Sequence, residues 1–172
     1  MINNIIKLIP TEIKFGKNEF RYKWLTYNDT AIGGKSISKV EQHDNHLIFR
    51  GNLKYTNKAA WSCLRSKKQD QDLSMYTSIA IKLKSDGLPL AFQMEYQEGW
   101  QDEKISCVIH TIPDEWTTVH LSMVDFHPIR FGEIVPEKLN TSVLHHILRY
   151  NFHVSSEVSI PFRLEIESIQ FS

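Results

Sequence analysis

Apolar and polar residues alternate with a period of two along several stretches of this chain. The clearest are Ile79–Lys84, Leu90–Gln97, Leu148–Val154 and Phe162–Glu167. Successive side chains of a β-strand point to opposite faces, so this pattern is typical of strands with one buried face. No stretch of helical length repeats its apolar residues with the 3.6-residue period of an amphipathic helix. The sequence therefore predicts an all-β domain.

Turn-forming residues separate the predicted strands. Asp86-Gly87 lies between the first two of them and predicts a β-hairpin. Phe126–Pro136 contains two prolines and a glycine and is expected to form a long surface loop, while Leu139–His146 is expected to hold one short helical turn. Short strands with turns between them predict a β-sandwich or barrel. The further expected strands are Phe15–Leu25, Leu47–Phe49, Ala59–Arg65, Ile105–Ile109 and Thr117–Leu121.

The properties of the whole chain limit its class and its partners. With 172 residues we expect a single domain over residues 1–172, with residues 1–14 as a lead-in segment. The 20 basic residues balance the 20 acidic ones, so no nucleic-acid partner is expected. Cys63 and Cys107 lie in apolar patterns and are expected to be buried free thiols.

No targeting or membrane segment is expected from the sequence. The chain has no run of about 18 apolar residues, so no membrane-spanning helix is expected. The first residues lack the basic leader and long apolar run of a signal peptide. We therefore expect a cytoplasmic location, although a mature form whose targeting segment had been removed would look the same.

Trp24–Ser38 concentrates residues that favour special backbone geometry. The side chains of Asn28-Asp29 can close turns onto nearby backbone, and Gly33-Gly34 permits a left-handed or closely approached backbone. Ser36 follows directly. Such a stretch fits a structural corner between strands, and it also fits the wall of a binding site.

No residue pattern completes a catalytic or metal site. Gly34-Lys35-Ser36 matches the end of a phosphate-binding P-loop, but Asp29 stands where that loop needs its first glycine. The pairs His43/His46 and His145-His146 lack a third ligand. The chain also lacks the G-x-S-x-G motif of a nucleophile elbow. We therefore expect no enzyme activity, no metal and no cofactor.

Tryptophan side chains offer a different route to function. Trp100 lies in the polar loop Gln97–Glu103, where carboxylates and amides could bond sugar hydroxyls beside an aromatic ring. Trp61 and Trp116 are further candidates, although large aromatic residues in a sandwich more often pack in the core.

Several short motifs follow one another along the chain in a fixed order. They are Trp24, Asn28-Asp29, Ile32-Gly33-Gly34, Ser36, Phe49-Arg50-Gly51, Ser62–Arg65, Asp72–Tyr76, Lys84–Gly87, Trp116–Pro128, Phe131-Gly132 and Phe162–Ile169. This order resembles the signature of the complex I intermediate-associated protein 30 family, from W…ND…MGG.S to a closing F.LEI..I strand. The resemblance spans Phe20–Ser172 and departs at Asn57–Trp61, where the family's usual glycines and phenylalanine are replaced.

The resemblance implies a galactose-binding-domain-like jelly-roll β-sandwich. It also implies a non-catalytic, chaperone-like assembly role with a protein partner, such as a respiratory-complex subunit or an assembly intermediate, and a mitochondrial location in a eukaryote. The alternative is a carbohydrate- or small-ligand-binding module that uses loops at one end of the same scaffold. The expected binding residues are Asn28, Asp29, Gly33, Gly34, Ser36, Trp100, Arg130 and Phe131.

Overall fold

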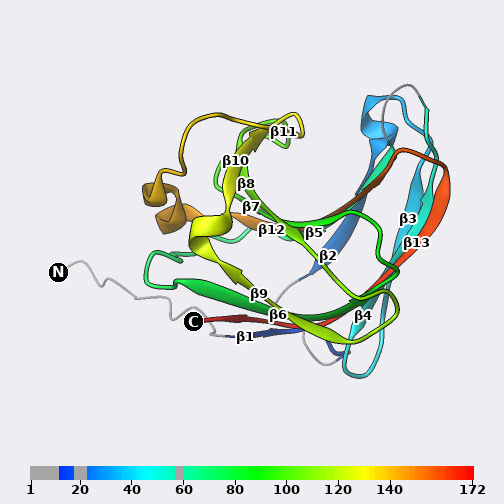
Figure 1. Ribbon diagram of the computed structural model, residues 1–172, viewed down its shortest axis with the longest axis horizontal. Helices are drawn as coiled ribbons and strands as arrows, with labels where there is room; N and C mark the ends of the chain where they lie inside the picture. The colour runs from blue at the N-terminus through cyan, green and yellow to red at the C-terminus, as the bar shows by residue number, and fades with distance from the viewer. Residues whose placement is uncertain (1–11, 18–22, 57–59) are drawn as a thin grey trace.

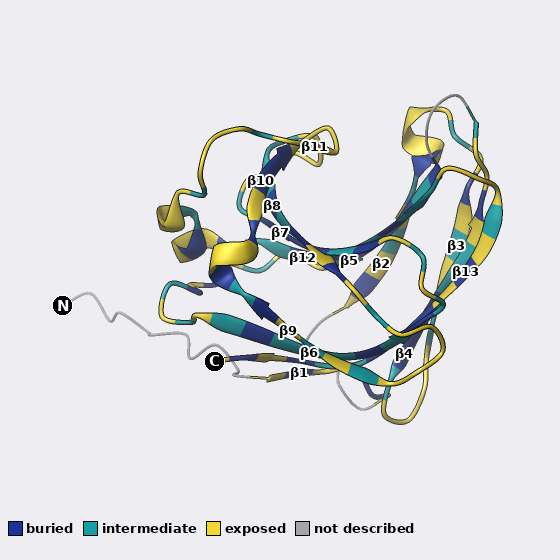
Figure 2. Ribbon diagram, in the orientation of Figure 1, coloured by how far each residue is buried: buried dark blue, intermediate teal, exposed yellow. Residues whose placement is uncertain are grey.

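A computed structural model describes residues 12–17, 23–56 and 60–172. Two antiparallel β-sheets pack face to face, and an apolar core fills the space between them (Figures 1 and 2). The helical segments of the described residues are short 3-10 turns, namely η1 (Asp29–Ile32), η2 (Met123–Asp125) and η3 (Thr141–His146). This architecture confirms the predicted all-β sandwich, and η3 confirms the helical turn expected within residues 139–146.

The first sheet has six strands in the order β3-β4-β13-β6-β9, with β1 also paired to β13. Their bounds are β1 Glu12–Lys14, β3 Ile37–Gln42, β4 Leu47–Leu53, β6 Ser78–Ser85, β9 Thr117–Ser122 and β13 Ile160–Phe171. One edge of β13 pairs first with β4 and then with β1, while its other edge pairs with β6. The last strand therefore joins the earliest described segment to the middle of the chain.

The second sheet has seven strands in the order β11-β10-β8-β7-β12-β5-β2. Their bounds are β2 Trp24–Asn28, β5 Ala60–Ser66, β7 Leu90–Glu95, β8 Lys104–Ile109, β10 His127–Arg130, β11 Glu133–Ile134 and β12 Arg149–Ser156. This sheet is strongly curved, so that β10 and β11 rise on one side and β2 with η1 on the other (Figure 1). We call the side that faces away from the core the concave face.

Each strand of the curved sheet contributes to both faces through the two-residue alternation. On β12, Tyr150 and Phe152 are buried in the core, with 2% and 0% of their surface exposed. The alternate residues Arg149, Asn151 and His153 belong to the concave face. The polar half of the sequence pattern thus forms the outer surface of this sheet.

The predicted hairpin around Asp86-Gly87 is wrong, although both of its strands are present. β6 lies in the six-stranded sheet and β7 in the seven-stranded sheet, so the chain crosses between sheets at this point. The Asp86 side chain accepts a hydrogen bond from the backbone N–H of Arg163 on β13, at 2.7 Å. Two strands that pair side by side and two strands that face each other across a core show the same alternation, so the pattern alone cannot distinguish them.

The segment 126–136, expected as an irregular loop, instead contains the hairpin of β10 and β11. Phe131 and Gly132 form its turn, with φ values of 52° and 82°. Positive φ at both central residues is typical of the tight turns that join antiparallel strands. Pro128 lacks an N–H group, but its carbonyl still accepts a hydrogen bond from Val135 at 2.9 Å. The expectation of a loop is therefore wrong for residues 127–134.

Some predictions fall partly outside the described residues. Of the expected lead-in 1–14, only residues 12–14 are described, and they form β1. Of the expected strand Phe15–Leu25, Phe15 is buried in the core and β2 begins at Trp24, while residues 18–22 lie outside the description. Cys63 and Cys107 are buried free thiols, as predicted.

Candidate functional site

Asp29, which is only 2% exposed, stabilises the Asn28–Ser36 corner that follows β2. Its carboxylate accepts hydrogen bonds from the Ser36 backbone N–H at 2.9 Å and from the Ser36 hydroxyl at 2.6 Å. A third bond comes from the backbone N–H of Trp61, at 3.2 Å. These donors compensate the cost of burying a charge. The carboxylate thereby ties the β2–β3 connection to β5.

The two glycines of this corner serve different purposes. Gly33 adopts the left-handed backbone, with φ of 89°. At Gly34, a Cβ atom would stand 2.3 Å from Oδ1 of Asp29, so a side chain there would displace the carboxylate. Asn28 also bonds internally, because its Oδ1 accepts hydrogen bonds from serine hydroxyls on β3 and β5, both at 2.7 Å. The corner residues are thus engaged chiefly with one another and with the adjacent strands.

Trp100, Arg130 and Phe131 lie at the other end of the curved sheet. Trp100 belongs to the β7–β8 loop and is 44% exposed, and Phe131 is 75% exposed at the tip of the β10–β11 hairpin. Arg130 links the hairpin to the loop through an ion pair with Glu103, at 3.3 Å. Lys104 donates a hydrogen bond to the Trp100 carbonyl at 2.8 Å. The loop and the hairpin therefore form one connected surface.

The expected site residues thus fall into two groups. The Asn28–Ser36 corner adjoins β2, whereas the Trp100 loop and the Phe131 turn adjoin β8, β10 and β11. Three strands, β7, β12 and β5, separate these groups in the sheet (Figure 1). The structure brings residues together within each group but not between them.

A polar network lies between the two groups, on the concave face. Glu95 of β7 is 3% exposed, and Arg65 of β5 donates to its carboxylate through Nε at 3.0 Å and Nη2 at 2.5 Å. From β12, Asn151 donates at 2.8 Å and Arg149 at 3.4 Å. A buried carboxylate with this many donors is compensated, and it holds the surrounding side chains in a fixed arrangement.

Aromatic rings flank this network. The rings of Trp61 and His153 stack with centroids 5.7 Å apart, and the Arg65 guanidinium lies 5.3 Å from the centroid of the Tyr27 ring. Burial lowers the pKa of His153 to about 4, with Lys104 as a smaller cause, so the imidazole is neutral at pH 7. The concave face thus presents aromatic rings next to hydrogen-bonding groups.

The sequence alone does not single out this network. Glu95 and Asn151 occupy polar positions of strands whose other positions are apolar, and such positions are usually solvated. Only the pairing of β12 with both β5 and β7 brings them beside Arg65. Three polar groups at outward positions of three separate strands predict a shared site only weakly. The order of the strands in the sheet cannot be read from the local sequence, so the sequence does not show that the guanidinium, the carboxylate and the amide meet.

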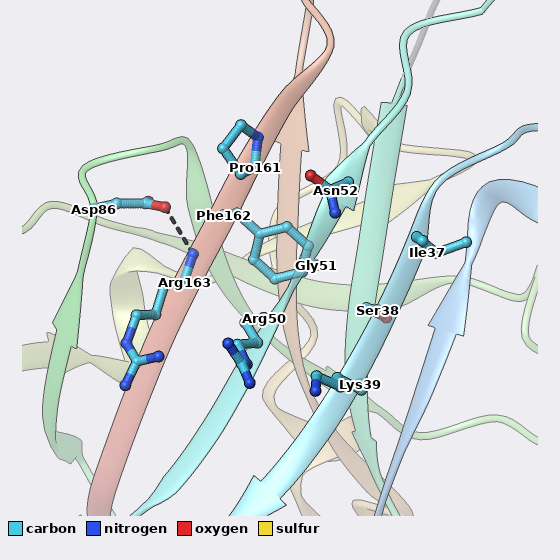
Figure 3. Close-up of a pocket in the computed structure, with 10 residues that line it drawn as sticks. All are labelled: Ile37, Ser38, Lys39, Arg50, Gly51, Asn52, Asp86, Pro161, Phe162 and Arg163. Carbon is cyan, nitrogen blue, oxygen red and sulfur yellow. Dashed lines mark hydrogen bonds between the residues drawn. The ribbon is translucent and has the colours of Figure 1, made fainter.

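A pocket of about 540 Å³ lies on the six-stranded sheet, over β3, β4 and β13 (Figure 3). Lys39, Arg50 and Arg163 line it. Lys39 and Arg50 each pair with Glu41 at 2.7 Å, and Arg163 pairs with Glu165 at 2.8 Å. Each of these cations is therefore already paired with a carboxylate of the same sheet face, with Glu41 shared by two of them.

Neither a metal cluster nor a membrane helix is found in the described part of the chain. No group of three or more His, Cys, Asp or Glu side chains among residues 12–17, 23–56 and 60–172 is arranged so that it could hold a metal ion. No helix within these ranges is long and apolar enough to span a membrane.

Solved structures with the same architecture include carbohydrate-binding modules. A family 11 carbohydrate-binding module of a cellulosomal cellulase from Clostridium thermocellum has a TM-score of 0.65 at 17% identity, covering 92% of this chain and 93% of that chain. A family 11 module from the same organism, in complex with a β-1,3-1,4-mixed-linked tetrasaccharide, has a TM-score of 0.63 at 16% identity, with coverages of 92% and 93%. The glycoside hydrolase domain of Endo-D from Streptococcus pneumoniae has a TM-score of 0.55 at 12% identity, covering 88% of this chain and 22% of that chain. At these identities the likeness shows the fold, and it confirms the predicted galactose-binding-like jelly roll.

The sequence comparison gives the family. No curated protein matches the chain in sequence. The family model described as complex I intermediate-associated protein 30 matches residues 13–166, which is most of the chain. The match confirms the resemblance carried by the ordered motifs, and the protein therefore belongs to the complex I intermediate-associated protein 30 family, a family of assembly factors.

Proposed function

We propose that this protein is a non-catalytic assembly factor that binds a protein partner at one edge of its curved sheet. The binding surface comprises Trp100, Arg130, Phe131 and Ile134, and we call it the hairpin-tip surface. Family membership supports an assembly role. The partner is a respiratory-complex subunit or an assembly intermediate, met in the mitochondrion of a eukaryote or the cytoplasm of a bacterium.

Phe131 is the observation that carries this proposal. It holds a left-handed backbone, with φ of 52°, and exposes 75% of its surface. A non-glycine residue in this conformation costs about 1–2 kcal/mol. An exposed phenylalanine ring buries little apolar surface, so packing does not offset this cost. A strained, displayed aromatic residue is more readily explained by recognition than by stability.

The surroundings of Phe131 suit a protein partner. Ile134 on β11 is 68% exposed and Trp100 is 44% exposed, so apolar area is available near the tip. The guanidinium of Arg130 pairs with Glu103 and still remains largely accessible to solvent. Aromatic and arginine side chains are enriched among the residues that dominate binding energy at protein interfaces.

We assign the corner residues Asn28, Asp29, Gly33, Gly34 and Ser36 to the scaffold. Their side chains and backbone bond to one another and to β3 and β5. In this proposal they shape the opposite edge of the sheet and do not contact the partner.

Site-specific photo-crosslinking tests the proposal. A photoreactive phenylalanine analogue at position 131 is compared with the same analogue at Val124, which is 82% exposed in η2. We expect position 131, and not position 124, to crosslink in cells to one predominant protein of the respiratory NADH:ubiquinone oxidoreductase or its assembly pathway. Identical adducts from both positions, or none from position 131, would contradict the proposal.

The carbohydrate-binding alternative is weaker in the Trp100 loop than on the concave face. Within the loop, Asp102 accepts a hydrogen bond from the Gly99 N–H at 2.8 Å, and Glu98 pairs with Lys68. These carboxylates therefore serve the loop itself. The concave face has the hydrogen-bonding groups and rings that a sugar requires.

A further inference from the structure

Two parallel rows of side chains cross the concave face. The first runs in register through Tyr27, Cys63, His153, Ala91 and Val108, over five neighbouring strands. His153 lies at the centre of this row, with the small side chains of Cys63 and Ala91 on either side of it. The exposed Tyr27 ring at one end of the row, and Trp61 beside it on β5, offer aromatic surface to a flat group laid across the strands.

The second row is polar and lies two residues further along each strand, at a spacing of about 7 Å. It runs through Arg65, Asn151, Gln93 and Ser106, which are paired in register on β5, β12, β7 and β8. One side of the first row is thus lined by guanidinium, amide and hydroxyl groups. This combination matches a ligand with a ring face and a hydroxyl-bearing edge.

The charges of the face favour a neutral ligand. Arg65 and Arg149 both donate to the Glu95 carboxylate, so their charge is already compensated. An anionic ligand would have to compete with this buried carboxylate for the same guanidinium groups. A neutral hydroxyl can bond to the edge of the network without breaking it.

Asn151 leaves a specific hydrogen-bonding requirement at the centre of the face. Its Nδ2 donates to Glu95 at 2.8 Å, which fixes the orientation of the amide, because the reverse orientation would place two oxygens together. Its Oδ1 is buried and accepts no hydrogen bond from any described residue. A hydroxyl donor arriving over the polar row is the group that this oxygen lacks.

We propose that the concave face binds a neutral oligosaccharide, laid across strands β2, β5, β12 and β7. Pyranose rings stack on Tyr27 and Trp61, and hydroxyls bond to Arg65, Gln93 and Asn151. This site lies apart from the hairpin-tip surface and does not depend on the protein partner proposed there.

The indole N–H signals of the protein test this site directly. The chain has four tryptophans, so a proton–nitrogen NMR spectrum shows four indole signals that Trp→Phe variants assign. The probes are linear tetrasaccharides of β-linked glucose and of β-linked galactose, with a sulfated oligosaccharide as the anionic comparison. We expect a neutral probe at millimolar concentration to shift the Trp61 signal and to leave the Trp116 signal in place.

Variants then assign the stacking. Tyr27→Ala is expected to weaken the affinity for the neutral probe about tenfold, while Tyr27→Phe retains the ring and most of the affinity. Trp61→Ala is expected to weaken binding similarly, and the matched variant Trp116→Ala to have no effect. Trp116 suits the control because it is 41% exposed and contacts Lys84 of the six-stranded sheet and His46 of the β3–β4 connection. Thermal melts confirm that each variant is folded.

Four outcomes would overturn the proposal. The first is that no neutral probe shifts the Trp61 signal. The second is a shift of the Trp100 signal instead, which would place the sugar in the β7–β8 loop. The third is binding of the sulfated probe alone. The fourth is a photo-crosslink from position 27 to a protein, which would make the concave face a protein interface.

Discussion

At Asp29, a single carboxylate explains most of the constraints on the corner that follows β2. Three protein donors converge on it, two from Ser36 and one from Trp61. The carboxylate needs room, and Gly34 provides it by having no Cβ. The left-handed backbone lies at Gly33 instead. The two adjacent glycines are therefore needed for different reasons: Gly33 for its backbone conformation and Gly34 for the space beside the carboxylate.

Gly34→Ala is expected to destabilise the protein by about 2–3 kcal/mol, because the new Cβ displaces the Asp29 carboxylate from its donors. Asp29→Ala removes the carboxylate but keeps its Cβ, which would stand 2.7 Å from the new Cβ at position 34. It should therefore reduce the cost of Gly34→Ala by about 1 kcal/mol without abolishing it. Urea unfolding of the two single variants and the double variant measures this coupling.

Gly33→Ala is the matched control for this cycle. Its Cβ would meet nothing within 4 Å, so only the left-handed backbone penalises it, at about 1 kcal/mol. We expect no coupling between Gly33→Ala and Asp29→Ala. Full additivity of Gly34→Ala with Asp29→Ala would contradict the role given to the carboxylate.

His153 makes the stability of the protein depend on pH. Burial lowers its pKa to about 4 in the folded state, against about 6.5 for a free histidine. Below pH 6.5 the imidazole of His153 therefore becomes protonated in the unfolded chain, while in the folded protein it stays neutral down to about pH 4. We expect stability to fall as the pH drops from about 6.5 to about 4, by at most about 1.4 kcal/mol per pH unit from this group.

His153→Gln isolates this effect. Glutamine does not titrate, so the variant should lose the His153 contribution to the slope between pH 6.5 and pH 4.5. Loss of the stacking contact with Trp61 would shift the whole curve without changing its slope. Urea unfolding across this pH range measures both, and an unchanged slope would refute the assignment.

At the scale of elements, the β10–β11 hairpin combines strain with exposure. Phe131→Gly should stabilise the protein by about 1 kcal/mol, because glycine adopts the left-handed backbone without a Cβ penalty. The same change should abolish the complex with the partner, since it removes the exposed ring. Thermal melting and co-purification of the partner measure the two effects. A destabilised variant would show that the ring supports the fold.

The strands could be predicted from the sequence, but their pairing could not. Alternation is a local property, so Leu90–Gln97 and Leu148–Val154 are recognisable as strands without knowledge of their neighbours. The partner of each strand depends on connections such as the one at Asp86-Gly87, which crosses between sheets. The β10–β11 hairpin was not predicted because the two prolines of the segment 126–136 are typical of a loop and because the turn places a phenylalanine at a left-handed position.

For the whole molecule, the same limit applies to the candidate sites. The hairpin-tip surface could be anticipated, because Trp100 and Phe131 are aromatic residues in polar or irregular segments. The concave face could not, because Glu95, Arg65 and Asn151 meet only through the order β7-β12-β5. Residues that act within one segment are visible in sequence, whereas residues that act across a sheet require the fold.

We propose that the chain is one domain that unfolds as a unit, because aromatic side chains from both sheets share one core. Phe171 of β13 lies 5.6 Å from Tyr150 of β12, between ring centroids. Phe15, which precedes β2, lies 4.9 Å from Trp24 and 6.4 Å from Phe152. Loss of contacts at either end of the chain should therefore weaken both sheets together.

Phe171→Ala tests this cooperativity, since it removes a ring that is 2% exposed at the last strand. We expect a loss of about 3–5 kcal/mol, with tryptophan fluorescence and far-ultraviolet circular dichroism reporting the same lower urea midpoint. The two probes respond to different parts of the molecule, because the fluorescence of Trp24 and Trp61 reports on the seven-stranded sheet whereas circular dichroism reports on the strands of both sheets, including β13 with Phe171. Separate midpoints would show that the sheets unfold independently, and they would contradict the assignment of a single domain.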